Sequence, residues 1–205
     1  MLAYIKGELA LKARGYIVID VGGLGYKVFM AENAMENIGK IGDIVKVHTY
    51  YRVMEDDISI FGFNTQEELR LFELLISVSG VGAKTAITML GTIEPSDFAI
   101  AIISNDINTL KKLPGIGPKT AGRIVLELKD KLKKEKQIEE IAIANDKQNG
   151  IKLKLQKDSK QEELETALQV LGYNNKQIDE VLEKVDSSLS IEEMIRAGIK
   201  ILARS

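Results

Sequence analysis

The chain contains one short string twice. Residues 78–86 read VSGVGAKTA and residues 113–121 read LPGIGPKTA, so the pattern G-x-G-x-K-T-A recurs after 35 residues. Apolar residues at helical spacing precede and follow each copy, which predicts two units of helix, tight glycine turn and helix. Glycine permits backbone conformations that other residues resist, and it lets a ligand approach the main chain closely. The repeat therefore predicts two similar turns that hold a ligand by the backbone.

The ligand expected at these turns is an anion. The first amides of each following helix lack partners within the helix, and such a helix start favours phosphate. Lys84 and Lys119 fall in that first turn, where a cation is unfavourable for the helix dipole unless an anion binds nearby. A pair of such turns suits the sugar-phosphate backbone of duplex DNA. The candidate DNA-binding residues are Gly80, Gly82, Lys84, Thr85, Gly115, Gly117, Lys119, Thr120 and Arg123.

Alternatives to DNA binding remain at the repeat. A nucleotide-binding P-loop needs the spacing G-x-x-x-x-G-K-[ST] after a strand, and neither copy has it. Two ordinary glycine-terminated helix junctions with solvated lysines would also give this pattern, although duplication of the whole string disfavours them. Arg123 is either a further phosphate ligand or a surface arginine on an amphipathic helix. Because neither turn carries the Arg, Asn or Gln side chains that usually distinguish bases, binding should not depend on DNA sequence.

The composition argues against several other kinds of site. The 205 residues include no cysteine and a single histidine, His48, so a thiolate or histidine metal centre and a histidine-based catalytic triad are not expected. We predict no metal, no cofactor and no catalytic residue. No signal layout and no apolar run of roughly 18 residues is present, which favours a cytoplasmic protein without membrane contact. The net charge of −2 argues against a uniformly basic DNA-binding protein but allows local basic faces.

The patterning predicts an α+β multidomain protein. Residues 1–63 contain five strand-like segments with alternating or continuous apolar residues, which suits a small closed β-barrel of the OB type. From residue 64 the period becomes helical, and either Asn64 or Thr65 is placed to cap the first helix. Residues 64–132 then form an all-α tandem helix-hairpin-helix domain.

Beyond residue 132 the pattern changes twice. Residues 133–159 are charge-rich with one short apolar interruption, which predicts a flexible linker. Residues 160–205 predict a three-helix bundle with helices at 161–171, 175–185 and 190–202. The expected core residues of this bundle are Leu168, Leu171, Val181, Leu182, Ile195 and Ile199.

An acidic run, Glu55-Asp56-Asp57, connects two of the predicted strands. The simplest interpretation is a solvated polar turn. A metal-dependent nuclease site is a second interpretation, but the sequence places no further carboxylate or histidine beside the run.

Several strings together resemble the RuvA family of Holliday-junction-binding proteins. These strings are the two glycine repeats, the hairpin VGGLGYKV, the segment YYRVMEDDISIFGF and the tail LETALQVLGYNNKQIDEVLEKV. The resemblance extends over nearly the whole chain, and the order of barrel, paired hairpins, linker and three-helix tail is its most specific part. The first copy has Ala83 where the second has Pro118, a departure that leaves the glycines in place.

The resemblance implies a function in recombination, DNA repair and the SOS response to DNA damage. It implies a homotetramer, one or two per junction, that holds four-way junction DNA open and recruits a hexameric ATPase motor of the RuvB type. A junction-resolving endonuclease is a further implied partner. Glu55 and Asp56 match the family's acidic pin, and the tail implies the motor-docking domain, with no contact residue assigned within 160–205.

Two other function classes remain open. A nuclease or ligase module of DNA repair would use the hairpins merely to hold duplex DNA. A protein-interaction module with a barrel and a helical tail would not need the glycine turns for binding.

Overall fold

The computed structural model describes residues 2–145 and 159–203. Along the chain the elements are β1 (Tyr4–Ala13), β2 (Tyr16–Val21), β3 (Leu24–Phe29), α1 (Glu32–Asn37), β4 (Ile44–Val53), β5 (Ile58–Phe63), α2 (Gln66–Ile76), α3 (Ala83–Leu90), α4 (Pro95–Ile103), α5 (Ile107–Leu110), α6 (Pro118–Asn145), α7 (Ser159–Val170), α8 (Asn175–Lys184) and α9 (Ile191–Leu202). No single helix in the described part of the chain is both long and apolar enough to cross a membrane.

The chain divides into two compact units. The first comprises residues 1–77 and 81–93, and the second comprises 78–80 and 94–205. This division cuts the predicted domain 64–132 between Ile93 and Glu94, so α2 and α3 pack with the barrel. The four-part division of the sequence into functional domains therefore stays a prediction.

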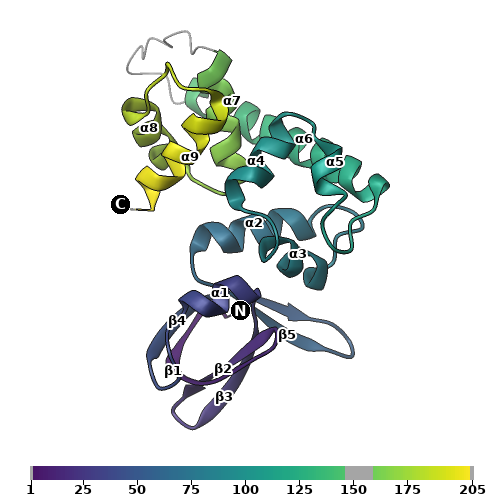
Figure 1. The fold of residues 1–205 in the computed structure, drawn as a ribbon, viewed down its shortest axis with the longest axis vertical. Helices are drawn as coiled ribbons and strands as arrows, with labels where there is room; N and C mark the ends of the chain where they lie inside the picture. Colours follow the sequence, from purple (N-terminus) through teal and green to yellow (C-terminus); the bar gives the residue numbers. More distant parts are fainter. Residues whose placement is uncertain (1, 146–158, 204–205) are drawn as a thin grey trace. The chain divides into compact units, whose positions relative to one another are not determined.

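The five strands of the first unit form a closed barrel in the order β1-β2-β3-β5-β4, as predicted (Figure 1). Neighbouring strands are antiparallel except for β3 and β5, which meet in parallel where Phe29 pairs with Phe61. Figure 1 also shows the β4–β5 hairpin extending beyond the rim of the barrel. This hairpin carries the acidic run at its tip.

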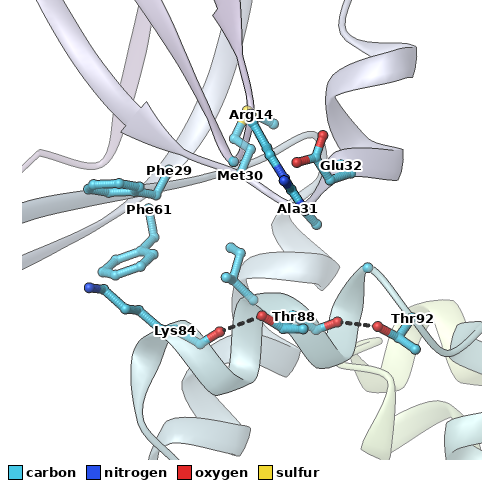
Figure 2. A pocket seen from close by; sticks show the side chains of 12 residues that line it. Arg14, Phe29, Met30, Ala31, Glu32, Phe61, Lys84, Thr88 and Thr92 are labelled. Atoms are coloured by element: carbon cyan, nitrogen blue, oxygen red, sulfur yellow. Dashed lines mark hydrogen bonds between the residues drawn. The ribbon is translucent and has the colours of Figure 1, made fainter. Parts of the chain in front are cut away.

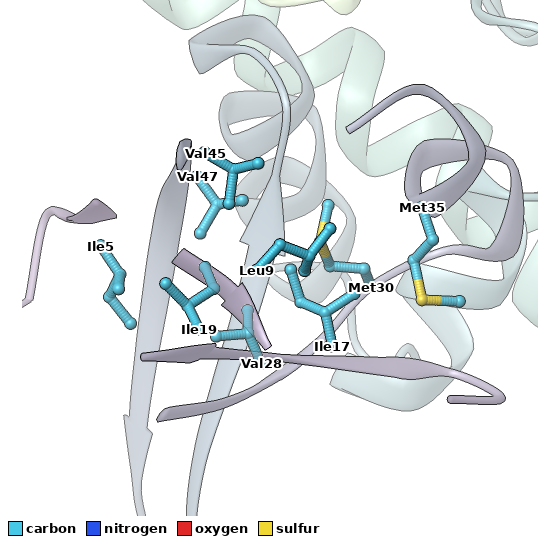
Figure 3. Packing of buried hydrophobic residues seen from close by; sticks show 9 residues of the cluster. All are labelled: Ile5, Leu9, Ile17, Ile19, Val28, Met30, Met35, Val45 and Val47. Atoms are coloured by element: carbon cyan, nitrogen blue, oxygen red, sulfur yellow. The ribbon is translucent and has the colours of Figure 1, made fainter. Parts of the chain in front are cut away.

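Strand alternation produces the barrel core. Every second residue of a strand points inward, so side chains such as Ile17, Ile19 and Val28 are fully buried. Figure 3 shows the whole cluster: Ile5, Leu9, Ile17, Ile19, Val28, Met30, Met35, Val45 and Val47. Burial of each such side chain contributes about 1.5–3 kcal/mol to the free energy of folding.

Helix α1 was not predicted. It is six residues long, has no side-chain cap at its start, and contains two Asn residues, which are weak helix formers. Tertiary contacts stabilise it instead, because Met35 is buried against the barrel and Lys12 Nζ donates to the Met35 carbonyl at 2.6 Å.

Helix α2 starts at the cap that the sequence offered. Thr65 accepts a hydrogen bond from the Glu68 amide, and the Glu68 carboxylate accepts one from the Asn64 amide. Phe72 then anchors the helix to the barrel through ring contacts of about 5 Å with Tyr50, Phe61 and Phe63. Helix α2, which precedes the first glycine turn in the sequence, is thus tied to the barrel.

The second unit contains the predicted three-helix bundle. α8 and α9 begin with capping boxes at Asn174 and Ser190, and Gly172 follows α7 with a φ of +90°. A Cβ at Gly198 would lie 2.8 Å from Val181 Cγ1, so glycine permits close packing of α8 and α9. Of the predicted core residues, Leu168, Leu171, Val181 and Ile195 are buried, whereas Leu182 and Ile199 are half-buried. The bundle also packs on α4, where Arg196 pairs with Asp97 at 2.9 Å.

The predicted linker at 133–159 overlaps the end of α6, and its bounds stay a prediction. The backbone of α6 stays helical to Asn145, because Lys, Glu, Ala and Ile at 133–145 support helix formation despite their charge. Ser159 already belongs to α7. The remainder of the predicted linker, 146–158, lies outside the described residues.

Candidate nucleic-acid interface

The two glycine turns have the same backbone conformation. Gly80 and Gly115 are left-handed, with φ of +91° and +78°, which L side chains rarely adopt. The apolar residue after each glycine is buried, Val81 at 5% and Ile116 at 6% exposure. This pair of features explains why each copy needs a glycine followed by an apolar residue.

The second glycine of each turn is not required by the fold. Gly82 is the N-cap residue of α3 with a φ of −87°, and a Cβ at Gly82 or Gly117 would meet nothing within 4 Å. Both residues are exposed. Since neither strain nor crowding demands glycine there, the missing side chain leaves bare main chain open to a ligand.

The helices that follow the two turns begin alike. Ala86 N donates to Gly82 O and Ala121 N to Gly117 O, each at 2.9 Å, and neither first turn contains an acidic residue. Earlier amides of each helix lack intrahelical partners, as at any helix start. These starts favour an anion, and they explain why exposed Lys84 and Lys119 are tolerated in the first turn.

The loop of the first turn lies against α6, next to the second turn. Arg123 Nη1 donates to Ser79 Oγ at 3.1 Å, and the Ser79 amide donates to Glu127 Oε2 at 3.4 Å. A Cβ at Gly80 would lie 3.8 Å from Thr120 Oγ1. The structure therefore brings Gly80 together with Thr120 and Arg123.

Sequence reasoning missed Ser79 and Glu127. The contacts of Ser79 with Glu127 and with Arg123 each join residues more than 40 positions apart, and no local sequence pattern predicts such a contact. Arg123 uses one of its five N–H donors on Ser79, which leaves the others for a phosphate. The remaining candidates divide between the units: Gly82, Lys84 and Thr85 belong to the first, and Gly115, Gly117 and Lys119 to the second.

The acidic run forms the turn between β4 and β5. Met54 N donates to Asp57 O at 2.8 Å, and Ser59 Oγ donates to the Asp57 carboxylate. All three residues of the run are exposed to solvent, and Asp57 in addition stabilises the turn. Among the described residues, no three His, Asp or Glu side chains are grouped so that they could hold a metal ion.

Three family models match successive parts of the chain. Residues 1–62 match the family model described as RuvA N terminal domain, and residues 159–203 match RuvA, C-terminal domain. Residues 72–130, which include both glycine turns, match a SAM-like helix-hairpin-helix tandem.

Full-length relatives agree with these matches. A protein of Acetivibrio thermocellus named "Holliday junction branch migration complex subunit RuvA" is 46% identical over 205 residues, which cover all of both chains. Proteins of the same name from Ruminiclostridium cellulolyticum and Clostridium perfringens strain 13 are 40% and 41% identical, covering 98% and 100% of this chain and all of each relative.

The chain belongs to the RuvA family. The barrel, the paired hairpins and the C-terminal helices occur in the order of the RuvA domains. The predicted fold class is confirmed, and the DNA-binding assignment of individual residues stays a prediction.

Proposed function

We propose that this protein is a non-catalytic DNA-binding subunit that recognises four-way junctions by their shape and works in branch migration. The observation that carries the proposal is the pair of turns whose second glycines, Gly82 and Gly117, leave the main chain exposed at the start of a helix. The curated relatives are named as subunits of a Holliday junction branch migration complex, which supports this substrate.

The two turns would hold the DNA backbone without reading bases. Lys84 and Lys119 would contact phosphates beside the free amides, and Thr85 and Thr120 would add hydroxyl contacts. Arg123 would extend the second contact along α6. Phosphate contacts position a protein on DNA but carry no direct sequence information, so junctions of any sequence should bind.

The exposed carboxylates of Glu55 and Asp56 would face the crossover and help to keep strands apart. Like charges about 4 Å apart cost on the order of 1 kcal/mol in water and about 4 kcal/mol at an intermediate dielectric. The summed repulsion from four such turns in a tetramer is comparable to the ~1.4 kcal/mol of one stacking step. Because branch migration breaks one base pair as another forms, this bias is large enough to guide the strands.

The chain would act with partners that supply the chemistry. A tetramer, singly or as two on one junction, would hold the DNA through the turns and the acidic run. A hexameric ATPase of the RuvB type would provide the motor, docked through residues 160–205, and a junction-resolving endonuclease would act later. We expect the complex in the cytoplasm.

The double variant Glu55→Gln/Asp56→Asn tests the proposed function against the nuclease alternative. We expect it to bind a synthetic immobile four-way junction as tightly as the wild type, or more tightly, in a gel shift without magnesium. The matched control is Glu162→Gln/Glu163→Gln on α7, which removes two exposed carboxylates elsewhere. Magnesium-dependent junction cleavage by the wild type that the double variant lacks would contradict the proposal.

A further inference from the structure

The outer face of β2 and β3 carries an aromatic and cationic cluster. Tyr16 pairs with Phe29 across the two strands, and their rings meet edge to face with centroids 6.4 Å apart. Lys27 Nζ lies 4.3 Å from the Tyr16 centroid and 5.0 Å from that of Phe29. Because Ile17 and Val28 point into the barrel core, these three side chains lie on the outer surface.

A groove of about 410 Å³ adjoins this cluster within the first unit. Its lining includes the ring of Phe29, the β1–β2 turn at Arg14 and Gly15, and Lys84 of α3. Figure 2 shows the Lys84 ammonium beside the ring of Phe61, on the opposite side of the groove from Arg14. The groove thus connects the outer barrel face to the first turn of the candidate DNA-binding helix α3.

The charge of this surface is mainly positive. Arg14, Lys27 and Lys84 contribute three cations, against the single carboxylate of Glu32 in the groove. Within the described residues, none of these three cations forms an ion pair. The hydroxyls of Thr88 and Thr92 donate to carbonyls of their own helix at 2.9 and 2.7 Å. The donors left for a ligand are therefore mainly the cationic groups, which select an anion.

We propose that Arg14, Tyr16, Lys27 and Phe29, with the adjoining groove, form a second DNA-binding surface that takes an unpaired strand. Aromatic rings that stack on bases, combined with cations that contact phosphates, are the usual means of holding single-stranded nucleic acid. OB-type barrels use the corresponding strands and the turn between β1 and β2 for this purpose. Only an unpaired base offers its face to such a ring, and branch migration opens a base pair at the crossover before its bases pair with the other strand.

This inference rests on the proposed function but is separable from it by experiment. Fluorescence anisotropy of the full-length protein with a labelled 15-nucleotide thymidine strand would compare Arg14→Ala/Lys27→Ala with a matched control, Lys6→Ala/Lys46→Ala. The control pair also removes two cations, and Lys46 likewise lies 4.7 Å from an aromatic centroid, that of Tyr4, on another part of the barrel. A Tyr16→Leu variant removes the ring while keeping the charge.

We expect the Arg14→Ala/Lys27→Ala variant to bind the strand about tenfold more weakly than the control. The slope of log affinity against log salt should fall by about 1.4, because each phosphate contact on a single strand contributes about 0.7. Tyr16→Leu should weaken binding without changing this slope.

Equal binding by the two double variants would overturn the inference, as would a wild type that binds no single strand. A changed molecular mass of Arg14→Ala/Lys27→Ala in light scattering would also overturn it, by assigning the surface to contact between copies of the chain. Junction preference over duplex, measured on the same samples, reports separately on the proposed function.

Discussion

The two glycine turns share a backbone but differ in their surroundings. Gly80 and Gly115 have nearly the same φ, and both turns bury the next residue. The first turn, however, is held by Arg123 and Glu127 through Ser79, and it follows a helix tied to the barrel. The second turn follows the four-residue helix α5. The comparison shows that glycine and one apolar residue define the turn, whereas its support comes from elsewhere in the chain.

The largest effect should come from filling the bare main chain of both turns. In Gly82→Val/Gly117→Val, each added side chain points into open space, so the free energy of unfolding should change by no more than about 1 kcal/mol per site. Junction affinity should fall at least tenfold because the DNA backbone can no longer approach. A gel shift and a urea titration measure the two quantities. Full junction binding by this folded variant would show that the second glycines do not face DNA.

The lysines test whether both turns contribute equally. Lys84→Ala and Lys119→Ala should each lower the salt slope of duplex binding by about 0.9 for every phosphate that the lysine neutralises. Anisotropy at several salt concentrations measures the slope, with Lys176→Ala, an exposed lysine on α8, as the control. A change for one lysine alone would show that the turns are unequal in function despite their common geometry.

Stability should respond to the first glycine of each turn. Alanine at Gly80 or Gly115 must adopt a positive φ, which costs about 1–2 kcal/mol. Urea denaturation of Gly80→Ala and Gly115→Ala should therefore show similar decreases in the free energy of unfolding, with Gly82→Ala as a control of negative φ. Unchanged stability in both variants would contradict the left-handed geometry of these turns.

The smallest expected effect is a difference in pH dependence between α2 and α5, the helices that precede the two turns. Hydrogen bonds from Thr109 lower the pKa of Asp106, the cap of α5, from its ordinary 3.8. Its contribution to stability is present above pH 3.8 and is lost as the pH falls through the lowered value. Burial instead raises the pKa of Glu68 in α2, so this group favours folding below its ordinary 4.5 and loses that contribution as the pH rises.

Acid should therefore weaken α5 before α2. The protection factor of the Thr109 amide, which corrects for the pH dependence of intrinsic exchange, should fall as the pH drops through the lowered pKa of Asp106, and the Glu68 amide should stay protected. The control Asp106→Asn keeps a capping side chain but cannot titrate, so its Thr109 amide should not show this pH-dependent loss of protection. The same pH response in Asp106→Asn and the wild type would remove Asp106 as the cause.

The parts predicted from the sequence are those with a local cause. The left-handed glycines, the alternating barrel strands and the cap at Thr65 each depend on residues within one or two turns of chain. The confirmed fold class follows from these local signals together with the resemblance to the RuvA family.

The features that the sequence did not predict depend on tertiary contacts, or on local sequence that is compatible with more than one structure. Helix α1 forms because Met35 is buried against the barrel, and the link from Ser79 to Arg123 crosses 44 residues. The role of Asp57 in bonding Ser59 was not evident beside two similar carboxylates. The full length of α6 was not evident from the sequence because charged residues are compatible with both helix and linker.

The most direct test of the central claim is a competition gel shift of the purified protein, without magnesium or ATPase. An immobile four-way junction would compete with linear duplex carrying the same arm sequences, for the wild type and for Lys84→Ala/Lys119→Ala. We predict strong preference for the junction, which the double variant should no longer show. Equal affinity of the wild type for both DNAs would contradict the account and leave only a general duplex-holding pair of hairpins.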